Sequence, residues 1–338
     1  MPALELACIV AGIGCAVYHP TTQWVETRFS NGYFPGWERA WAAIGSAFPF
    51  ALGDAFALLA TALVLWRLSV ALRRRSLRAL IDVAAVAGVL AVWFYAGWGW
   101  GYNRAPIETR VKYDSAKVDA AAIGRLQARA VAQVNRLAPL AHSQSKTQTS
   151  GLQLAVAWQP VVQRLGDSWQ PAVDPAKPTF FGPFMAASGT SGFVDPFTLE
   201  TQLAPDLLWF EIPFSQAHEW SHVAGFNRED EANYIAILTC LRDQDVVAQY
   251  SGWLEMLLYL PSKHYRPSDF AYQVRQDFAA LRERNAKHIN VGLSRFSWHL
   301  YNAYLKSNHV AKGIQNYNEV TRLLVGIPLD RNTLPQVR

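Results

Sequence analysis

The stretch HEWSH at residues 218–222 places two histidines four positions apart, and the chain continues as VAGFNREDEAN to Asn233. On an α-helix this spacing puts the imidazoles of His218 and His222 on one face, close enough to share one tetrahedral Zn²⁺ ion. Glu219 follows the first histidine, where its carboxylate can act as a general base toward a zinc-activated water. The pattern therefore predicts a metal-binding helix with Glu219 as its catalytic residue.

The residues after His222 predict a second helix that supplies a third zinc ligand. Gly225 can end the first helix and Asn227 can cap the next one, which opens with Glu229 and Glu231. Glu229 shares its helix face with small residues, so this face can approach the histidine helix closely. Glu231 shares its face with bulky residues that suit a core. We therefore favour Glu229 as the third ligand and keep Glu231 as the alternative.

Four further polar side chains are candidates for supporting roles. Asn233 lies one turn after Glu229, where its amide can hydrogen-bond a ligand histidine. Tyr250, Tyr304 and His309 lie in polar, aromatic segments, and each can donate a hydrogen bond to the oxyanion of a tetrahedral intermediate. The competing interpretation of each is a packed tyrosine or a surface histidine.

The first hundred residues predict three membrane segments. Half of the chain is hydrophobic (51%) and 17% is charged, against about 25% in average soluble domains, and the apolar excess gathers near the N-terminus. Apolar runs cover residues 3–18, 42–66 and 79–100, and the first is short for a span of about 20 residues. A cleaved signal peptide is the alternative for that run. Because it lacks a basic start and a clear cleavage site, we expect an uncleaved anchor.

Arginines predict how these segments are oriented. Five of them separate the second and third apolar runs: Arg67, Arg73, Arg74, Arg75 and Arg78. Loops rich in Lys and Arg stay in the cytoplasm, so everything after residue 102 is expected on the opposite side. The prediction is a multi-pass domain at residues 1–102 in the lipid bilayer of a bacterial inner (plasma) membrane. An extracytoplasmic domain at residues 103–338 follows it.

The second domain is expected to be mainly α with a small β part, an α+β fold. Helical spacing covers residues 116–137 and most of the chain after Asp206, whereas residues 151–200 are rich in Gly, Pro, Thr and Val and predict short strands. Residues 192–198 could form an edge strand that holds a peptide by backbone pairing. The alternative is a turn, which Asp195-Pro196 favours.

Charge and cysteine content exclude several functions. The net charge is +5, but the arginine cluster between the apolar runs accounts for most of it and no nucleic-acid-binding motif accompanies it. The three cysteines form no CxxC pair, so a thiolate metal site is not expected. No apolar run of membrane length contains the HEWSH stretch, which argues against an intramembrane protease.

An HExxH helix followed by E-x-x-A-N resembles the gluzincin peptidases, whose third ligand is a glutamate. More narrowly, the chain resembles an uncharacterised bacterial domain-of-unknown-function family of polytopic membrane proteins with this signature. The likeness covers most of the chain and includes the stretches SNGYFP at residues 30–35, GYNR at 101–104, GFVDPFT at 192–198 and YSGW at 250–253. The resemblance implies a zincin-like metallopeptidase domain outside the cytoplasm. Many gluzincins carry an acidic residue four positions after the glutamate ligand, where this chain has Asn233.

Together these patterns predict a membrane-anchored zinc metallopeptidase that acts on a peptide or protein substrate. Two alternatives stay open: a non-catalytic zinc-binding membrane sensor or scaffold, and an amidase acting on cell-wall peptides. Glu219 favours hydrolysis over a scaffold, because a purely structural metal site needs no carboxylate beside its first ligand. The oligomeric state is left open.

Overall fold

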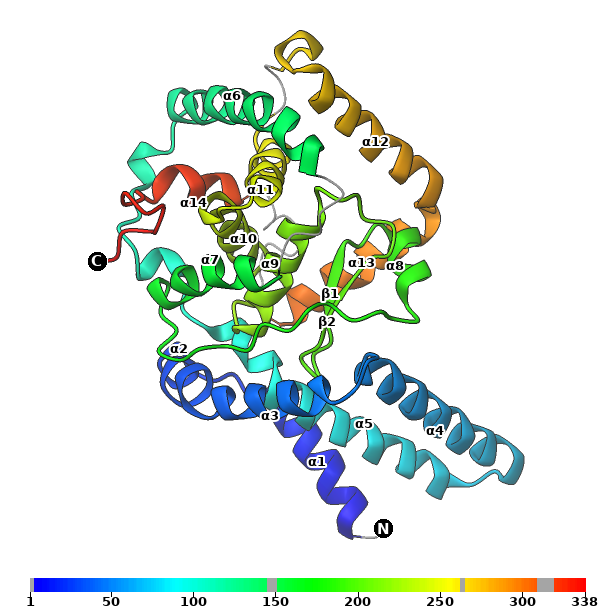
Figure 1. Ribbon diagram of the computed structural model, residues 1–338. Coiled ribbons are helices and arrows are strands. Elements are labelled where there is room, and N and C mark those ends of the chain that lie inside the picture. The colour runs from blue at the N-terminus through cyan, green and yellow to red at the C-terminus, as the bar shows by residue number, and fades with distance from the viewer. Residues whose placement is uncertain (1–2, 145–150, 262–264, 309–318) are drawn as a thin grey trace.

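A computed structural model describes residues 3–144, 151–261, 265–308 and 319–338, and in them the chain is mostly helical with one small two-stranded sheet (Figure 1). This confirms the predicted mainly α composition with a small β part. Of the candidate site residues, His309 lies outside the described residues.

The N-terminal hundred residues form a group of helices below the main body in Figure 1. The elements are α1 (Ala3–Val17), α2 (Thr22–Trp24), a π-helical segment (Val25–Tyr33), α3 (Phe34–Ser46), α4 (Leu52–Arg74) and α5 (Leu77–Gly97). Both α4 and α5 are long and apolar enough to cross a membrane, and the bent pair formed by α1 and residues 22–46 makes a third candidate. The apolar helices that were expected are therefore present, and they are compatible with a membrane protein.

The continuous apolar pattern over residues 42–66 predicts one uninterrupted segment, but the structure divides this run between two helices. Helix α3 ends at Ser46 and α4 begins at Leu52. Pro49 lies between them. A proline has no N–H to donate, and it also disfavours helical backbone at the residue before it, here Phe48. The apolar span that remains is α4 itself.

Small residues bring α1 and α5 into close contact. A methyl group at Gly12 would lie 2.5 Å from Cα of Gly88, so only glycine allows this approach. At the far end of the α4–α5 hairpin, Arg67 pairs with Asp82 at 3.4 Å, and Arg75 adopts a left-handed turn conformation. The arginine cluster thus lies at the tip of a hairpin that projects away from the main body (Figure 1).

The main body is helical, and short 3₁₀ turns lead into it. Its elements are 3₁₀ turns Gly99–Asn103, Ile107–Thr109, Ser115–Lys117 and Pro267–Asp269, helices α6 (Ala120–Gln144), α7 (Gly151–Arg164), α8 (Gly182–Ser188), α9 (Ile212–Val223), α10 (Glu229–Arg242), α11 (Val246–Tyr259), α12 (Tyr272–His288), α13 (Val291–Ser307) and α14 (Val320–Gly326), and strands β1 (Gly192–Val194) and β2 (Thr201–Leu203). Helix α10 is at the centre, packed against α7, α9, α11 and α14. Its residues 229–240 are all buried, so this helix is the axis of the core.

The segment at residues 192–198 contains both structures that its sequence predicted. Strand β1 pairs antiparallel with β2, with Phe193 opposite Gln202. Directly after β1, Oδ1 of Asp195 accepts hydrogen bonds from the backbone N–H groups of Phe197 (2.9 Å) and Thr198 (2.8 Å). This is the local bonding that makes aspartate a turn former. The strand and the turn follow one another.

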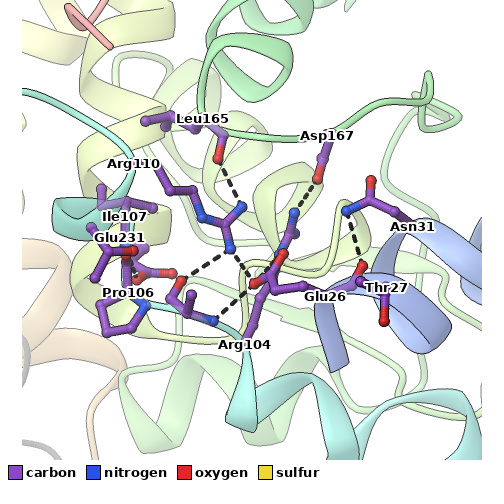
Figure 2. Close-up of polar contacts among 12 residues, drawn as sticks. Glu26, Thr27, Asn31, Arg104, Pro106, Ile107, Arg110, Leu165, Asp167 and Glu231 are labelled. Carbon is purple, nitrogen blue, oxygen red and sulfur yellow. Dashed lines mark hydrogen bonds and ion pairs between the residues drawn. The ribbon is translucent and has the colours of Figure 1, made fainter. Parts of the chain in front are cut away.

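A buried polar cluster joins the N-terminal helices to the main body (Figure 2). Arg104 pairs with Asp167 at 2.5 Å and donates to the carbonyl of Ala224 at 3.2 Å, in the turn between α9 and α10. Glu26, in the π-helical segment, accepts from Arg110 and from the backbone N–H of Ala105. The segment that follows α5 therefore fixes the turn that precedes the candidate site.

Candidate metal centre

Helix α9 carries His218 and His222 on one face, as the i,i+4 spacing predicts. Their Nε2 atoms are 3.1 Å apart, and their ring centroids are 4.7 Å apart. The helix begins with Pro213 in its first turn, where a missing N–H costs nothing. It ends at Val223, two residues before Gly225, whose φ of 81° is a left-handed conformation that glycine adopts without strain. Two local signals thus fix the ends of the histidine helix.

Glu229, the first residue of α10, lies directly beside the histidine pair. Its Oε2 is 3.3 Å from Nε2 of His218, and its Oε1 is 3.7 Å from Nε2 of His222. Within the described ranges, these three side chains form a group whose ligand atoms all lie within 4.8 Å of one another. Two imidazole nitrogens and one carboxylate oxygen, converging on one point, could hold a metal ion.

The tautomer of His222 leaves its inner nitrogen available as a ligand. Nδ1 of His222 lies 2.8 Å from the carbonyl oxygen of Phe226. A carbonyl can only accept, so Nδ1 carries a proton, and Nε2 would direct its lone pair toward His218 and Glu229 once its own proton is displaced. This is the arrangement by which a backbone carbonyl orients a metal-binding histidine.

The three groups also shift one another's pKa values. Burial alone would raise the pKa of Glu229, but His222 and His218 outweigh it and hold that pKa well below its ordinary value. Burial likewise opposes a proton on His222, yet Glu229 outweighs it and raises the pKa of His222 to about 9. The site is therefore one that holds positive charge, and a cation bound there would displace a proton.

Glu219 lies in the same cavity, pressed against the backbone of β1. The side chain is 5% exposed. A methyl group at Gly192 would lie 2.2 Å from Oε1 of Glu219, so the strand and the carboxylate are in direct contact. Burial raises the pKa of Glu219, while the two histidines act in the opposite direction. A carboxyl whose pKa is moved toward neutrality is suited to general acid–base chemistry.

The alternative ligand Glu231 points elsewhere. Its Oε1 accepts a hydrogen bond from the backbone N–H of Ile107 at 3.1 Å and lies 3.7 Å from Nε of Arg228, within the polar cluster of Figure 2. Burial raises the pKa of Glu231 to about 7. Of the two carboxylates weighed from the sequence, the structure brings Glu229 to the histidines and uses Glu231 to hold the chain after α5.

Two other candidates make their hydrogen bonds to groups other than the histidines. Asn233 accepts a hydrogen bond through Oδ1 from the hydroxyl of Tyr259 at 2.9 Å, instead of bonding a ligand histidine. The hydroxyl of Tyr250 donates to Asp277, and its ring stacks on Trp209 with centroids 6.0 Å apart. Tyr250 is thus a packed tyrosine, the competing interpretation of its sequence context.

Helix α13 adds tyrosines to the site, one of which the sequence reasoning missed. The hydroxyl of Tyr301 donates to Oε1 of Glu229, and the hydroxyls of Tyr304 and Tyr102 are 3.1 Å apart. Burial raises the pKa of Tyr304 to about 12, so its hydroxyl stays protonated. Trp298, Tyr301 and Tyr304 recur every three residues on one helix face. That spacing is the signal that could have found Tyr301.

A cavity of about 720 Å³ is lined by His218, His222, Glu219, Glu229 and the tyrosines Tyr301 and Tyr304. Its polar lining includes Glu255, a carboxyl that the sequence reasoning also missed and whose pKa burial raises to about 8. Besides residues of α9, α10 and α11, the lining comes from β1 and the segments on both sides of it, from α8 and the residue before it, from α13, from α4, and from the segment directly after α5. The candidate site is therefore a partly open space large enough for a segment of several residues, with ionisable groups in its lining.

Comparisons with known proteins identify a family without a known function. A family model described as protein of unknown function (DUF3810) matches residues 29–325. No curated protein and no solved structure is significantly similar to the chain. The match agrees with the resemblance to an uncharacterised family and covers helices α3 to α5 as well as the histidine site.

Proposed function

The chain belongs to the DUF3810 family of proteins of unknown function, and we propose that it is a membrane-anchored zinc metallopeptidase that hydrolyses peptide bonds. The observation that carries the proposal is the convergence of His218, His222 and Glu229, with a buried Glu219 beside them in a 720 Å³ cavity. A structural metal site has no use for an added carboxylate or for a cavity of this size.

The spacing of the three side chains supports zinc as the metal. Ligand atoms at about 2.0–2.2 Å from a tetrahedral zinc are about 3.3–3.6 Å from each other. The two histidine nitrogens are 3.1 Å apart, and they lie 3.3 and 3.7 Å from different oxygens of the Glu229 carboxylate, so a small shift of these side chains would bring three ligand atoms to that spacing. His218, His222 and Glu229 would hold the ion and leave one position open, as in catalytic sites. When bound, zinc would polarise the substrate carbonyl and acidify water.

Glu219 is assigned the role of general base and then general acid. It would take a proton from the water that attacks the carbonyl carbon and pass that proton to the amine nitrogen as the C–N bond breaks. The raised pKa of Glu219 suits both transfers. Its contact with Gly192 fixes its position relative to β1, the strand beside which the peptide would lie.

Two tyrosines support this reaction. Tyr304 keeps its proton and lines the cavity, so its hydroxyl is the candidate donor to the oxyanion. Tyr301 holds Glu229 by a hydrogen bond and thereby orients the third ligand. Tyr250, whose hydroxyl is bonded to Asp277, takes no part in this scheme.

Strand β1 is assigned the role of binding the peptide backbone. One edge of β1 pairs with β2, and β2 in turn forms a bridge to Lys177 on its other side. Residues of β1 also line the cavity. An extended substrate could therefore add to β1 as a further strand, which gives binding without dependence on side-chain sequence. A cell-wall peptide could bind in the same way, and amidase activity on such a peptide is the second candidate reaction.

The location assigned to the enzyme is the bacterial plasma membrane, with the cavity on the extracytoplasmic side. The arginine-rich hairpin tip and the start of α1 lie at one end, where Arg78 and Glu5 are 4.0 Å apart. The histidine site lies at the other end of α5. Positively charged tips stay in the cytoplasm. A reporter that works only in the periplasm should be active after Arg338 and silent at Arg75, and the reverse pattern would refute this orientation.

Metal content and hydrolysis of a peptide library test the proposal together. The purified full chain should carry about one zinc per chain and cut the library. The His218→Ala, His222→Ala double variant should have lost both properties. His288→Ala, a histidine at the end of α12 away from the cavity, is the matched control and should keep both. Equal zinc in the double variant and the wild type would refute the proposed ligands.

A further inference from the structure

The cavity reaches the helices that are candidates for membrane spans. Ala57 of α4, together with Trp98 and Tyr102 in the segment directly after α5, lines the same space as His218 and Glu219. Ala57 lies five residues into α4, which is about 7.5 Å along the helix axis at 1.5 Å per residue. The headgroup layer of a bilayer is about 5–7 Å thick on each side. If α4 spans the membrane and begins at the outer edge of the headgroups, this wall of the cavity lies near the boundary between headgroups and hydrocarbon.

An exposed group of phenylalanines forms the rim of the cavity on this side. Phe180, Phe181 and Phe184 are 78%, 44% and 47% exposed, and Phe193 of β1 is 43% exposed. Three of them, Phe181, Phe184 and Phe193, also line the cavity. Exposed apolar side chains that gather in one place mark an interaction surface, whereas single ones do not.

This rim is fixed to the beginning of α4. The buried carboxylate of Asp54 accepts hydrogen bonds from the hydroxyl of Thr179 (2.9 Å) and from the backbone N–H of Phe180 (2.7 Å). Phe48 and Phe50, which directly precede α4, are 40% and 46% exposed. The phenylalanines are therefore continuous with the apolar surface of α4, and α8 lies on the same side of the body as the α4–α5 hairpin (Figure 1).

We propose that the Phe180–Phe184 rim inserts into the bilayer interface, and that the substrate is a polypeptide tethered to the same membrane. Aromatic rings are favoured at the boundary between headgroups and hydrocarbon. With the rim inserted, the cavity opens beside the lipid surface. A chain anchored there meets it at a high effective concentration. The substrate class rests on the proposed hydrolysis, whereas the insertion of the rim does not.

Labels in lipid nanodiscs test the insertion. The full chain, with Cys8→Ala and Cys15→Ala, would carry a polarity-sensitive fluorophore at Phe180→Cys or, as control, at Tyr272→Cys. Phe180 does not line the cavity, and Tyr272 is 63% exposed on α12. The label at position 180 should be blue-shifted and quenched by nitroxide lipids, unlike the label at 272. Equal, water-like emission at both positions would refute the insertion. Blue-shifted emission at position 180 that nitroxide lipids do not quench would also refute the insertion, because it indicates that the label contacts protein rather than lipid.

One randomised peptide library, free or coupled at one end to a lipid anchor, tests the substrate class in proteoliposomes. The anchored form should be cut at least tenfold faster, at bonds close to the anchor. Phe180→Ser should reduce that advantage and leave cleavage of the free library unchanged, whereas Tyr272→Ser should alter neither. Equal rates, or cuts spread evenly along the peptides, would refute the substrate class and leave hydrolysis standing. A zinc-loaded protein that cuts neither library would refute the proposed function, and the labels would still decide the insertion.

Discussion

The two walls of the cavity are built differently. The wall formed by α9 and α10 is buried along nearly its whole length and carries the histidines, Glu219 and Glu229. A second wall is formed by α13, which is largely exposed or half-buried and has Leu305 as its buried residue. That exposed wall nevertheless supplies Tyr301 and Tyr304. A deep core therefore sets the positions of the ionisable groups, and lightly packed elements cover them. This division suits a site whose chemistry is rigid and whose access can vary.

The largest expected effect separates the two carboxylates of the buried wall. Glu229→Gln should weaken zinc binding by more than the about 10–100-fold that an outer partner contributes, because it removes a ligand. Glu231→Gln is the matched control and should keep zinc, since that carboxylate bonds Ile107 instead. Zinc titration of both purified variants distinguishes them. Loss of zinc in the Glu231 variant alone would mean that the assigned ligand is wrong.

A smaller effect is expected where strand β1 meets the buried wall. A methyl group added by Gly192→Ala would lie 2.2 Å from Oε1 of Glu219 and must displace that carboxylate. Misplacing a catalytic group by about 1 Å can cost about 100-fold in rate. We expect the variant to keep zinc and to lose hydrolysis by about that factor. Gly124→Ala, which meets no atom within 4 Å, is the control and should match the wild type. An unchanged rate of hydrolysis in Gly192→Ala would mean that the position of Glu219 does not matter to the reaction.

The smallest effect is expected on the exposed wall. Tyr301→Phe removes the hydrogen bond to Glu229 and keeps the ring. Zinc affinity should fall about tenfold, the lower end for a group that orients a ligand. Tyr272→Phe, an exposed tyrosine on α12, should change nothing. If Tyr301→Phe abolished zinc binding altogether, the exposed wall would be as necessary for holding the metal as the buried wall, which contradicts the proposed division between them.

Sequence reasoning reached the buried wall because local geometry determines it. Helical spacing predicts that His218 and His222 share a face, and the small residues near Glu229 indicate which side of α10 can approach α9. Tyr301 is different, because it lies 72 positions from Glu229 and meets it only through the packing of α13. The same holds for Arg104, whose contact with Ala224 spans 120 positions. Such contacts depend on how the elements pack, which periodicity does not encode.

The break between α3 and α4 has a different cause. The apolar pattern over residues 42–66 predicts one continuous segment, although the sequence of this run contains Pro49. The structure ends α3 at Ser46 and restarts the helix at Leu52. Apolar periodicity carries no information about backbone hydrogen bonds, whereas a proline interrupts them. Pro49 is therefore the better guide to where the helix breaks.

The most direct test of the central claim is to compare Glu219→Gln with the wild type for zinc content and for cleavage of the same peptide library. This substitution keeps the shape of the side chain and removes the base. We expect a folded, membrane-inserted variant that carries about one zinc per chain and hydrolyses the library at least about a hundredfold more slowly. A zinc-loaded Glu219→Gln variant that cuts as fast as the wild type would contradict the assignment of Glu219 as the catalytic base.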